Sequence, residues 1–400
     1  MLSYDQALAQ ILSAALPLPI TDIPLLDARG LTLAADVVSP VFLPPFDNSA
    51  MDGYAVRFHD VAGATLDNPR RLPLAGLIAA GDAAPPSLPD GAALRIMTGA
   101  PLPPGADTVI PIEDTEIDGE QVAVRDPGAF GQFVRASGGD AAPGDTLLVR
   151  GSTVRPQEIA VAAALGLRTL PVYRRPRVAI ISTGDELVEP GHALAFGQIY
   201  NSNACALAAQ VAEAGGEVSV RRHARDTPDA LRAAFDACAS SDIILTSGGV
   251  SVGEFDYVKA VWAERGTLDF WQVAVRPGKP LAFGAWEGRR LFGLPGNPVA
   301  SLVTFELFVR PALRVMMGMA NPVRPTVTAT LAEAVGHQTG RRSFLRGTVT
   351  PSEAGWVAHA SARQGSHQLS ALPHSNALLV VPEDVTMLPA GASITALLLG

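Results

Sequence analysis

The chain has little cysteine, and this scarcity excludes several kinds of site. Cys205 and Cys238 are its two cysteines in 400 residues, and neither belongs to a C-x-x-C pair. A disulfide framework and a thiolate zinc centre are therefore not expected. The seven histidines are scattered through the sequence without the spacing of metal ligands.

Long apolar runs and basic runs are also missing. No apolar stretch approaches the roughly 18–20 residues that cross a membrane. The N-terminus, MLSYDQALAQ, is acidic rather than basic, so it does not resemble a signal peptide. With a net charge of −9, the chain is expected to bind neither nucleic acid nor a membrane. A cytoplasmic protein is the expectation.

What the sequence does contain predicts a folded protein of several domains. Apolar residues make up 48% of its 400 residues and charged residues 17%. Its 33 prolines and 38 glycines cluster between residues 40 and 145. This clustering predicts a β-rich domain over 41–142, with short strands at 108–112 and 121–124.

The segments on either side of this β-rich part each predict a helix. Ser3 and Gln6 form a capping-box pattern before an apolar helical face. A second helix is expected after Pro156, which stands near its start. We expect this helix to pack on the N-terminal one, so that 1–40 and 143–172 form one discontinuous domain.

From residue 173 to 318, strand and helix patterns alternate. Strands are expected at 177–182, 217–222, 242–246 and 270–275, and helices at 202–214, from Pro228, at 257–265 and at 298–317. Asp226 or Thr227 would cap the helix that begins at Pro228. Alternation predicts a three-layer α/β domain with a mostly parallel sheet, whose ligands bind at the carboxyl ends of the strands.

Short strands dominate the remaining residues, 319–400. They are expected at 326–331, 343–349, 377–381 and 394–399, separated by turn residues. A small β-barrel or sandwich is indicated. The fold class is therefore multidomain, α/β plus β.

The run Ser247–Asp256 (SGGVSVGEFD) carries the strongest local signal of chemistry. It lies between a strand and a helix, where backbone N–H groups can surround an anion. Gly248, Gly249 and Gly253 would let the backbone approach a phosphate closely, and Ser251 adds a hydroxyl. Glu254 and Asp256 suit a Mg²⁺ ion between carboxylate and phosphate. A surface turn with helix-capping acids explains this run equally well.

Other strand-end loops add charged groups to the same crevice. Its acids are Asp185, Glu186, Asp226, Glu254 and Asp256, which point to Mg²⁺ or, alternatively, to helix caps. Arg276 and Lys279 lie in a proline-fixed turn that suits an oxyanion, although a solvated turn is the alternative. Leu294–Pro298 precedes a helix and could bind an anion or only cap that helix.

Loops outside this crevice give weaker signals. Pro44–Tyr54 and Arg95–Ala100 are turn-rich, and chemistry alone assigns them no role. Arg341, Arg342 and Arg346, with Gln364–His367, could form a second anion pocket, although arginines on strands usually form a solvated face.

Taken together, the motifs resemble those of the molybdopterin molybdotransferase family, which includes the gephyrin E domain. The resemblance covers nearly the whole chain and rests on motifs that occur in order. They are PPFDNSAMDGYAV (44–56), RIMTGAPLPPGADTVIPIEDT (95–115), STGDEL (182–187), GQIYNSN (197–203), TSGGVSVGEFDYVK (246–259), RPGKPLAFG (276–284) and GLPGNPVAS (293–301).

The resemblance implies an elongated homodimer of four-domain subunits. The active site would lie between the α/β domain of one subunit and the proline-rich β domain of the other. The implied reaction joins molybdate with adenylylated molybdopterin and releases AMP, with Mg²⁺. A molybdopterin adenylyltransferase would act upstream, and molybdoenzymes or cofactor-transfer proteins downstream.

The family's functional positions can be carried over residue by residue. Catalytic roles would fall on Asp52, Thr98, Glu186, Asp256 and Lys279, of which Glu186 and Asp256 would hold Mg²⁺. Substrate contacts would fall on Asp226, Ser247, Gly248, Gly249, Ser251, Gly253, Arg276, Pro295, Pro298, Arg346 and Ser366. The family often has lysine at the position of Arg276, and Ser370 is an alternative to Ser366.

Two other functions remain open at this point. The α/β domain also resembles a molybdopterin adenylyltransferase, although that enzyme is a single domain. A non-catalytic molybdopterin-binding scaffold or sensor is the second alternative. The polar groups Asp52, Glu186, Asp256 and Lys279 count against a scaffold.

Overall fold

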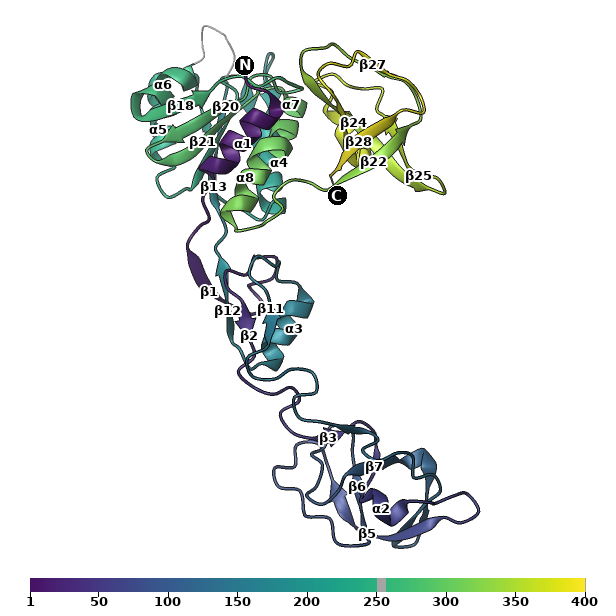
Figure 1. Ribbon diagram of the computed structural model, residues 1–400. Coiled ribbons are helices and arrows are strands. Elements are labelled where there is room, and N and C mark those ends of the chain that lie inside the picture. The colour runs from purple at the N-terminus through teal and green to yellow at the C-terminus, as the bar shows by residue number, and fades with distance from the viewer. Residues whose placement is uncertain (250–256, 400) are drawn as a thin grey trace.

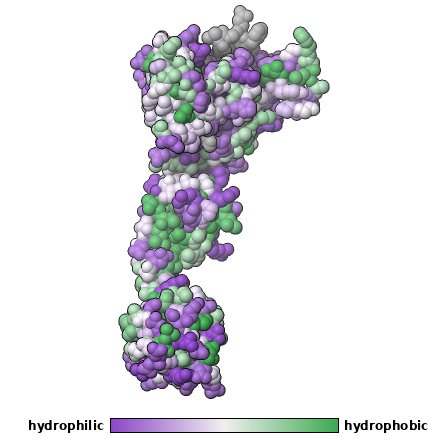
Figure 2. Space-filling model, turned by 90° about the vertical axis from the view of Figure 1, so that its right-hand side faces the viewer, coloured by the Kyte–Doolittle hydropathy of each residue, from purple (hydrophilic) through white to green (hydrophobic). Residues whose placement is uncertain are grey.

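The computed structural model describes residues 1–249 and 257–399, which form an elongated molecule (Figure 1). An α/β region and a β-barrel lie side by side at one end. A narrow middle region leads from them to a β-rich region at the other end. The same elongated outline is seen from the side (Figure 2). In the described part of the chain, no helix combines the length and apolarity needed to cross a bilayer.

A six-stranded mixed sheet forms the centre of the α/β region. Its strand order is β16-β13-β17-β21-β20-β18. The strands are β13 (Arg177–Thr183), β16 (Glu217–Ala224), β17 (Ile243–Ser247), β18 (Gly266–Phe270), β20 (Ala282–Trp286) and β21 (Arg289–Leu294). The first four in this order run parallel, whereas β20 is antiparallel to both of its neighbours.

Helices cover both faces of this sheet, because each face buries its own apolar cluster. Buried residues of α1 (Tyr4–Ala14), α4 (Ser202–Glu213), α7 (Pro298–Thr304) and α8 (Arg310–Met316) share one cluster. Those of α5 (Pro228–Asp236) and α6 (Tyr257–Arg265) share the other. A π-helical turn, η2 (Phe305–Val309), joins α7 to α8. The layered arrangement matches the alternation of strand and helix patterns in the sequence.

The capping box expected at the first helix is present. The Ser3 hydroxyl accepts a hydrogen bond from the Gln6 backbone N–H at 3.2 Å, and the Gln6 side chain accepts one from the Ser3 N–H at 3.0 Å. The predicted packing of this helix is wrong, however. Ala7 and Ile11 are buried against the α/β region, beside α8, and not against the helix that begins at Pro156. The apolar spacing predicted a buried face but could not identify its partner.

The predicted strand at 270–275 is also wrong. The strand at this edge of the sheet is β18, which ends at Phe270. A separate short strand, β19 (Val275–Arg276), pairs in parallel with the barrel strand β24. The apolar run therefore divides between two sheets.

The middle region consists of two short ribbons and one helix. Strand β1 (Ile20–Pro24) pairs with β12 (Thr169–Tyr173), and β2 (Val37–Val38) pairs with β11 (Thr146–Leu148). Helix α3 (Pro156–Ala164) contributes to the apolar cluster that these strands bury.

The β-rich region contains a second six-stranded sheet, with the order β7-β4-β6-β5-β9-β8. Its strands are β4 (Gly53–Val56), β5 (Arg70–Ile78), β6 (Ala93–Ile96), β7 (Thr108–Pro111), β8 (Thr115–Asp118) and β9 (Gln121–Val124). Short elements complete it: β3 (Asn48–Ser49), β10 (Val134–Arg135), α2 (Phe58–Val61) and the 3-10 turn η1 (Ile112–Asp114).

The C-terminal strands close into a five-stranded barrel, because β24 pairs with both β25 and β26. The barrel strands are β22 (Thr326–Leu331), β24 (Arg342–Ser352), β25 (Gly355–Ala360), β26 (Ala377–Val381) and β28 (Ser393–Leu398). Strand β25 was not predicted. Two further elements are a small ribbon of β23 (Val335–Gly336) with β27 (Met387–Leu388) and the 3-10 segment η3 (Leu369–His374).

Candidate functional site

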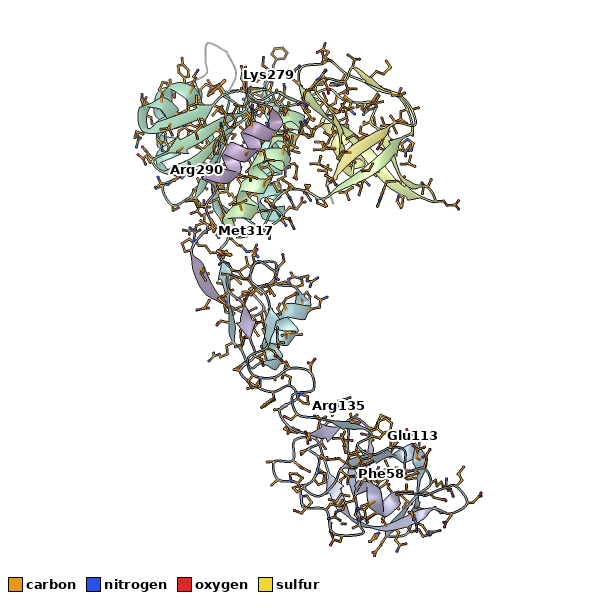
Figure 3. All side chains as sticks on the ribbon, in the orientation of Figure 1. Phe58, Glu113, Arg135, Lys279, Arg290 and Met317 are labelled. Carbon is orange, nitrogen blue, oxygen red and sulfur yellow. The ribbon has the colours of Figure 1, made fainter. Side chains whose placement is uncertain are left out.

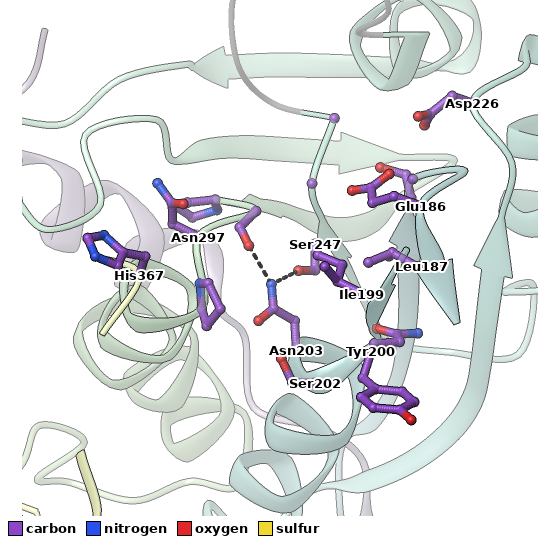
Figure 4. A pocket seen from close by; sticks show the side chains of 18 of the residues that line it. Glu186, Leu187, Ile199, Tyr200, Ser202, Asn203, Asp226, Ser247, Asn297 and His367 are labelled. Atoms are coloured by element: carbon purple, nitrogen blue, oxygen red, sulfur yellow. Dashed lines mark hydrogen bonds between the residues drawn. The ribbon is translucent and has the colours of Figure 1, made fainter. Parts of the chain in front are cut away.

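The carboxyl ends of the parallel strands meet at one cleft. Strand register places Ser182 of β13 beside Ser247 of β17, and Ser247 beside Leu294 of β21. The loops that follow these strands surround a cleft of about 720 Å³ (Figure 4). Its described lining residues are Thr183, Gly184, Glu186, Leu187, Ile199–Asn203, Asp226, Ser247–Gly249, Pro280, Pro295–Pro298 and His367. Ribbon β14 (Leu187–Val188) with β15 (Ile199–Tyr200) forms part of its rim.

The start of the glycine-rich turn requires glycine for geometric reasons. Gly248 and Gly249 have φ angles of +92° and +66°, which L-residues rarely adopt. A Cβ atom at Gly249 would lie 2.3 Å from a methyl group of Val258, and one at Gly248 would lie 3.0 Å from the Thr183 carbonyl oxygen. The backbone is therefore bare where the cleft meets this turn. Ser251, Gly253, Glu254 and Asp256 lie outside the described residues.

Asn203 connects two loops of the cleft, and the sequence interpretation assigned it no role. Its side-chain NH₂ donates to the Ser247 hydroxyl at 2.9 Å and to the Gly296 carbonyl at 2.8 Å (Figure 4). These bonds join the end of β17 to the turn before α7. The position of Asn203 in the first turn of α4, at a strand-end crevice, was the signal available in the sequence.

The carboxylates of the cleft lie at one end of it, where Figure 4 shows Glu186 and Asp226 near each other. Thr227, not Asp226, caps α5, because its hydroxyl accepts from the Ala230 N–H at 3.4 Å. Asp226 is thus left to face the cleft. Burial, and then the charges of Asp185 and Glu186, raise the pKa of Asp226.

This acidic end is not a complete metal centre by itself. Among residues 1–249 and 257–399, no three His, Cys, Asp or Glu side chains gather in a metal-binding group. Of the predicted metal ligands, Glu186 is in the cleft, and Asp256 lies outside the described residues. Mutual repulsion of the carboxylates is nevertheless the electrostatic condition that a hard cation relieves.

Neither of the predicted cations, Arg276 and Lys279, is among the described lining residues of the main cleft. Figure 3 shows Lys279 at the top of the α/β region, towards the barrel. Arg276 does not line the main cleft. It lines a second cavity, of about 440 Å³, together with His337 and Ser343 of the barrel region.

Arg346 is fully buried, contrary to the solvated face that arginines on strands usually form. Its guanidinium donates to the carbonyl oxygens of Arg363 and Gly365, the latter at 3.3 Å. It therefore holds the barrel loop that contains Ser366. The Ser366 carbonyl accepts from the Val299 N–H of α7 at 3.2 Å, whereas the Ser370 hydroxyl accepts from Arg363 at 3.1 Å.

Asp52 and Thr98 do not reach this cleft within one chain. They flank strands β4 and β6 of the β-rich region, which forms the opposite end of the molecule (Figure 1). Both side chains are exposed and hydrogen-bonded to each other. Asp52 accepts from the Thr98 N–H and hydroxyl, each at 2.7 Å, and these bonds lower the pKa of Asp52.

The fold and the cleft define a class of protein. A glycine turn, carboxylates and bare backbone meet at the strand ends of an α/β sheet, as in enzymes that bind phosphate-bearing ligands. Sequence comparison identifies the particular family. Residues 2–166 match the "MoeA N-terminal region (domain I and II)", 179–315 the "Probable molybdopterin binding domain" and 328–399 the "MoeA C-terminal region (domain IV)".

Relatives match over the whole chain. A protein named molybdopterin molybdenumtransferase 2 from Mycobacterium tuberculosis is 43% identical, with 98% of this chain and 97% of that protein covered. A molybdopterin molybdenumtransferase from Synechococcus elongatus is 39% identical, with 98% of each chain covered. The chain belongs to the molybdopterin molybdenumtransferase family.

Solved structures agree with this membership. The crystal structure of the molybdopterin biosynthesis MoeA protein from Pyrococcus horikoshii superposes with a TM-score of 0.85. It is 33% identical, and the match covers 100% of this chain and 99% of that one. The multidomain fold with mixed sheets and a closed barrel is therefore the fold of the family.

Proposed function

We propose that this chain inserts molybdenum from molybdate into adenylylated molybdopterin and releases AMP. The observation that carries the proposal is the cleft itself, which combines a bare glycine turn with carboxylates in a chain related to molybdenumtransferases along its full length. We also propose that the chain is divided into the four domains expected from the sequence.

The acidic end of the cleft is suited to Mg²⁺. Burial and the neighbouring charges of Asp185 and Glu186 disfavour the ionised form of Asp226, and a bound cation would reverse this effect. Glu186 and Asp256 would hold the ion, and Asp226 lies near Glu186. When bound, Mg²⁺ supplies positive charge next to the phosphate oxygens of the substrate.

The remaining residues bind and orient the substrates. Gly248 and Gly249 admit the phosphoanhydride close to the backbone, because no Cβ occupies that space. Asn203 keeps the two adjoining loops at a fixed separation. Lys279, from the turn before Pro280, supplies a cation for molybdate.

The chemistry needs two kinds of bond to break. Water adds to the phosphoanhydride and AMP leaves, so that molybdopterin keeps its own phosphate. The two dithiolene sulfurs then bond to molybdenum, while one oxo group of molybdate leaves as water with the two thiol protons. The pterin provides the thiolates, so the protein needs no cysteine in the cleft, and among its described lining residues there is none.

The active unit in this proposal is a homodimer. Asp52 and Thr98 are too far from the cleft of their own chain to act there, so the partner subunit's β-rich region would supply them. Figure 2 shows apolar side chains gathered on one face of the middle region, which would offer a surface for the second copy. Among the exposed apolar residues of this region are Ile20, Leu26, Val38 and Val149, which are 57%, 80%, 48% and 57% exposed.

The substrate of this reaction indicates which kinds of reaction come before and after it. An adenylylated molybdopterin must come from an adenylyltransferase upstream. The product is a molybdenum cofactor, which a molybdoenzyme or a cofactor-transfer protein would accept.

The test is AMP release by the purified protein from adenylylated molybdopterin with Mg²⁺, in the presence and absence of molybdate. We expect release to depend on molybdate and the product to reactivate a molybdenum-free apoenzyme. ATP consumption with plain molybdopterin would instead indicate an adenylyltransferase. Tight pterin binding with neither activity would indicate a scaffold or sensor.

A further inference from the structure

The barrel contributes one residue to the described lining of the cleft, His367. The other described lining residues lie between Thr183 and Pro298, in the α/β region. Figure 4 shows the imidazole beside Asn297, at the end of the cleft opposite Glu186 and Asp226. The cleft thus has an acidic end and a second end whose described lining includes no carboxylate.

Three backbone contacts bring His367 to this place. The Ser366 carbonyl accepts from the Val299 N–H at 3.2 Å, which joins the barrel loop to the first turn of α7. The Gly365 N–H donates to the Gln368 side chain at 2.8 Å, and the Gly365 carbonyl accepts from Arg346 at 3.3 Å. The turn is therefore held from the α/β region, from its own next residues and from the barrel interior.

The ring of His367 also depends on a missing side chain. A Cβ atom at Gly365 would lie 2.9 Å from Cε1 of His367, closer than real Cβ contacts. Glycine at this position lets the imidazole fold back over the turn. Alanine would displace the ring without removing it.

A substrate with several negative groups would use the two ends of the cleft differently. The group neutralised by Mg²⁺ belongs at Glu186 and Asp226. A second oxyanion would be repelled there and favoured at the far end, where an imidazole N–H can donate to it.

We propose that His367 is a substrate-contacting residue that donates a hydrogen bond to a tetrahedral oxyanion at the end of the cleft opposite the carboxylates. The proposal rests on the molybdotransferase function proposed above. The oxyanion is either molybdate or a phosphate of the pterin nucleotide, and the test distinguishes them.

The experiment compares His367→Ala, His367→Gln and Gly365→Ala with wild type in the full-length protein. His374→Ala serves as the matched control, because His374 is exposed on the adjoining η3 segment and does not line the cleft. Calorimetry with sodium molybdate alone and with AMP alone measures binding without turnover. Steady-state AMP release then gives KM for each substrate.

We expect His367→Ala to weaken binding of one oxyanion by roughly tenfold or more, as for loss of a hydrogen bond to a charged group. A change confined to molybdate assigns molybdate, and a change confined to AMP or the pterin nucleotide assigns a phosphate. Gly365→Ala should produce a smaller loss for the same ligand. His367→Gln, which retains an N–H donor, should recover part of the affinity.

The proposal is overturned if His367→Ala and His374→Ala bind both anions as wild type does. It is also overturned if wild type binds neither anion. If wild type binds molybdate in a His367-dependent manner but releases no AMP, the contact stands as an anion contact while the proposed function fails.

Discussion

Subunit complementation offers a decisive test of where the active site lies. Asp52 is exposed at the far end of the elongated chain, whereas Glu186 lines the cleft of the α/β region. If each cleft uses the partner subunit's β-rich region, Asp52→Asn and Glu186→Gln subunits should each be nearly inactive alone. Mixed together, they should regain activity.

The size of the recovery follows from the two-fold symmetry of a dimer. Random exchange of equal amounts makes about half of the dimers mixed, and each mixed dimer has one intact and one doubly substituted cleft. AMP release by the mixture should therefore reach about one quarter of the wild-type rate. Mixed dimers isolated with two different tags should reach about one half.

A cis double variant supplies the control. When Asp52→Asn/Glu186→Gln subunits are mixed with wild type, both clefts of a mixed dimer are damaged if sites are shared. Activity should then fall to about one quarter, rather than the one half expected for a site within one chain. A complementing mixture no more active than its parents, after subunit exchange is demonstrated, would refute the shared site.

Three further predictions follow from single contacts. Asp226→Asn should stabilise the protein at neutral pH without Mg²⁺ and should reduce the rise in Tm that Mg²⁺ gives wild type. The pKa of Asp226 is raised in the folded state, so the protonated carboxyl favours folding at low pH, and this stability is lost as the pH rises past 3.8, the ordinary pKa of an aspartate. Gly284→Ala should destabilise the protein by about 1–3 kcal/mol in urea titrations, because the new Cβ would clash with a backbone carbonyl of β18. Arg342→Ala should increase proteolysis of the segment before the barrel, because Arg342 forms two bonds, of 3.0 and 2.9 Å, with Asp5 of α1; Arg341→Ala is its control.

Each of these outcomes can fail on a stated observation. If the stability of the Asp226→Asn variant depends on pH as that of wild type does, carboxylate repulsion at Asp226 does not destabilise the folded protein. Wild-type urea midpoints for Gly284→Ala would show that β18 can move aside. Equal proteolysis of the Arg341 and Arg342 variants would mean that the ion pair does not hold the barrel.

Local signals predicted the elements that depend on neighbouring residues. The capping box at Ser3 and Gln6 and the helix at 257–265 are both present as predicted. A glycine-rich turn after β17 was predicted, and Gly248 and Gly249 have the backbone angles that only glycine adopts easily, whereas their approach to a ligand stays a prediction. These features are encoded within a few residues, so a single sequence was sufficient.

Errors arose where the partner of a segment is distant in the sequence. The apolar face of α1 could have packed on any helix, and its actual partner, α8, begins at Arg310. The run at 270–275 reads as one strand, but Val275 and Arg276 pair with the barrel strand β24. Pairing between sheets leaves no periodic signal in the segment that crosses from one to the other.

The same reasoning explains why no place in this cleft was predicted for Asn203 or for His367, which the sequence assigned only to a possible second anion pocket with Arg346. One of the contacts that bring His367 to the cleft is the bond of Ser366 to Val299, a residue 67 positions earlier in the chain. Asn203 matters because Ser247 and Gly296 converge on its amide. A motif in the loop after one strand predicts which residues of that loop contact a ligand. A cleft assembled from several loops also depends on residues that hold those loops together. The positions least visible in the sequence are therefore those whose substitution should change substrate affinity without changing the fold.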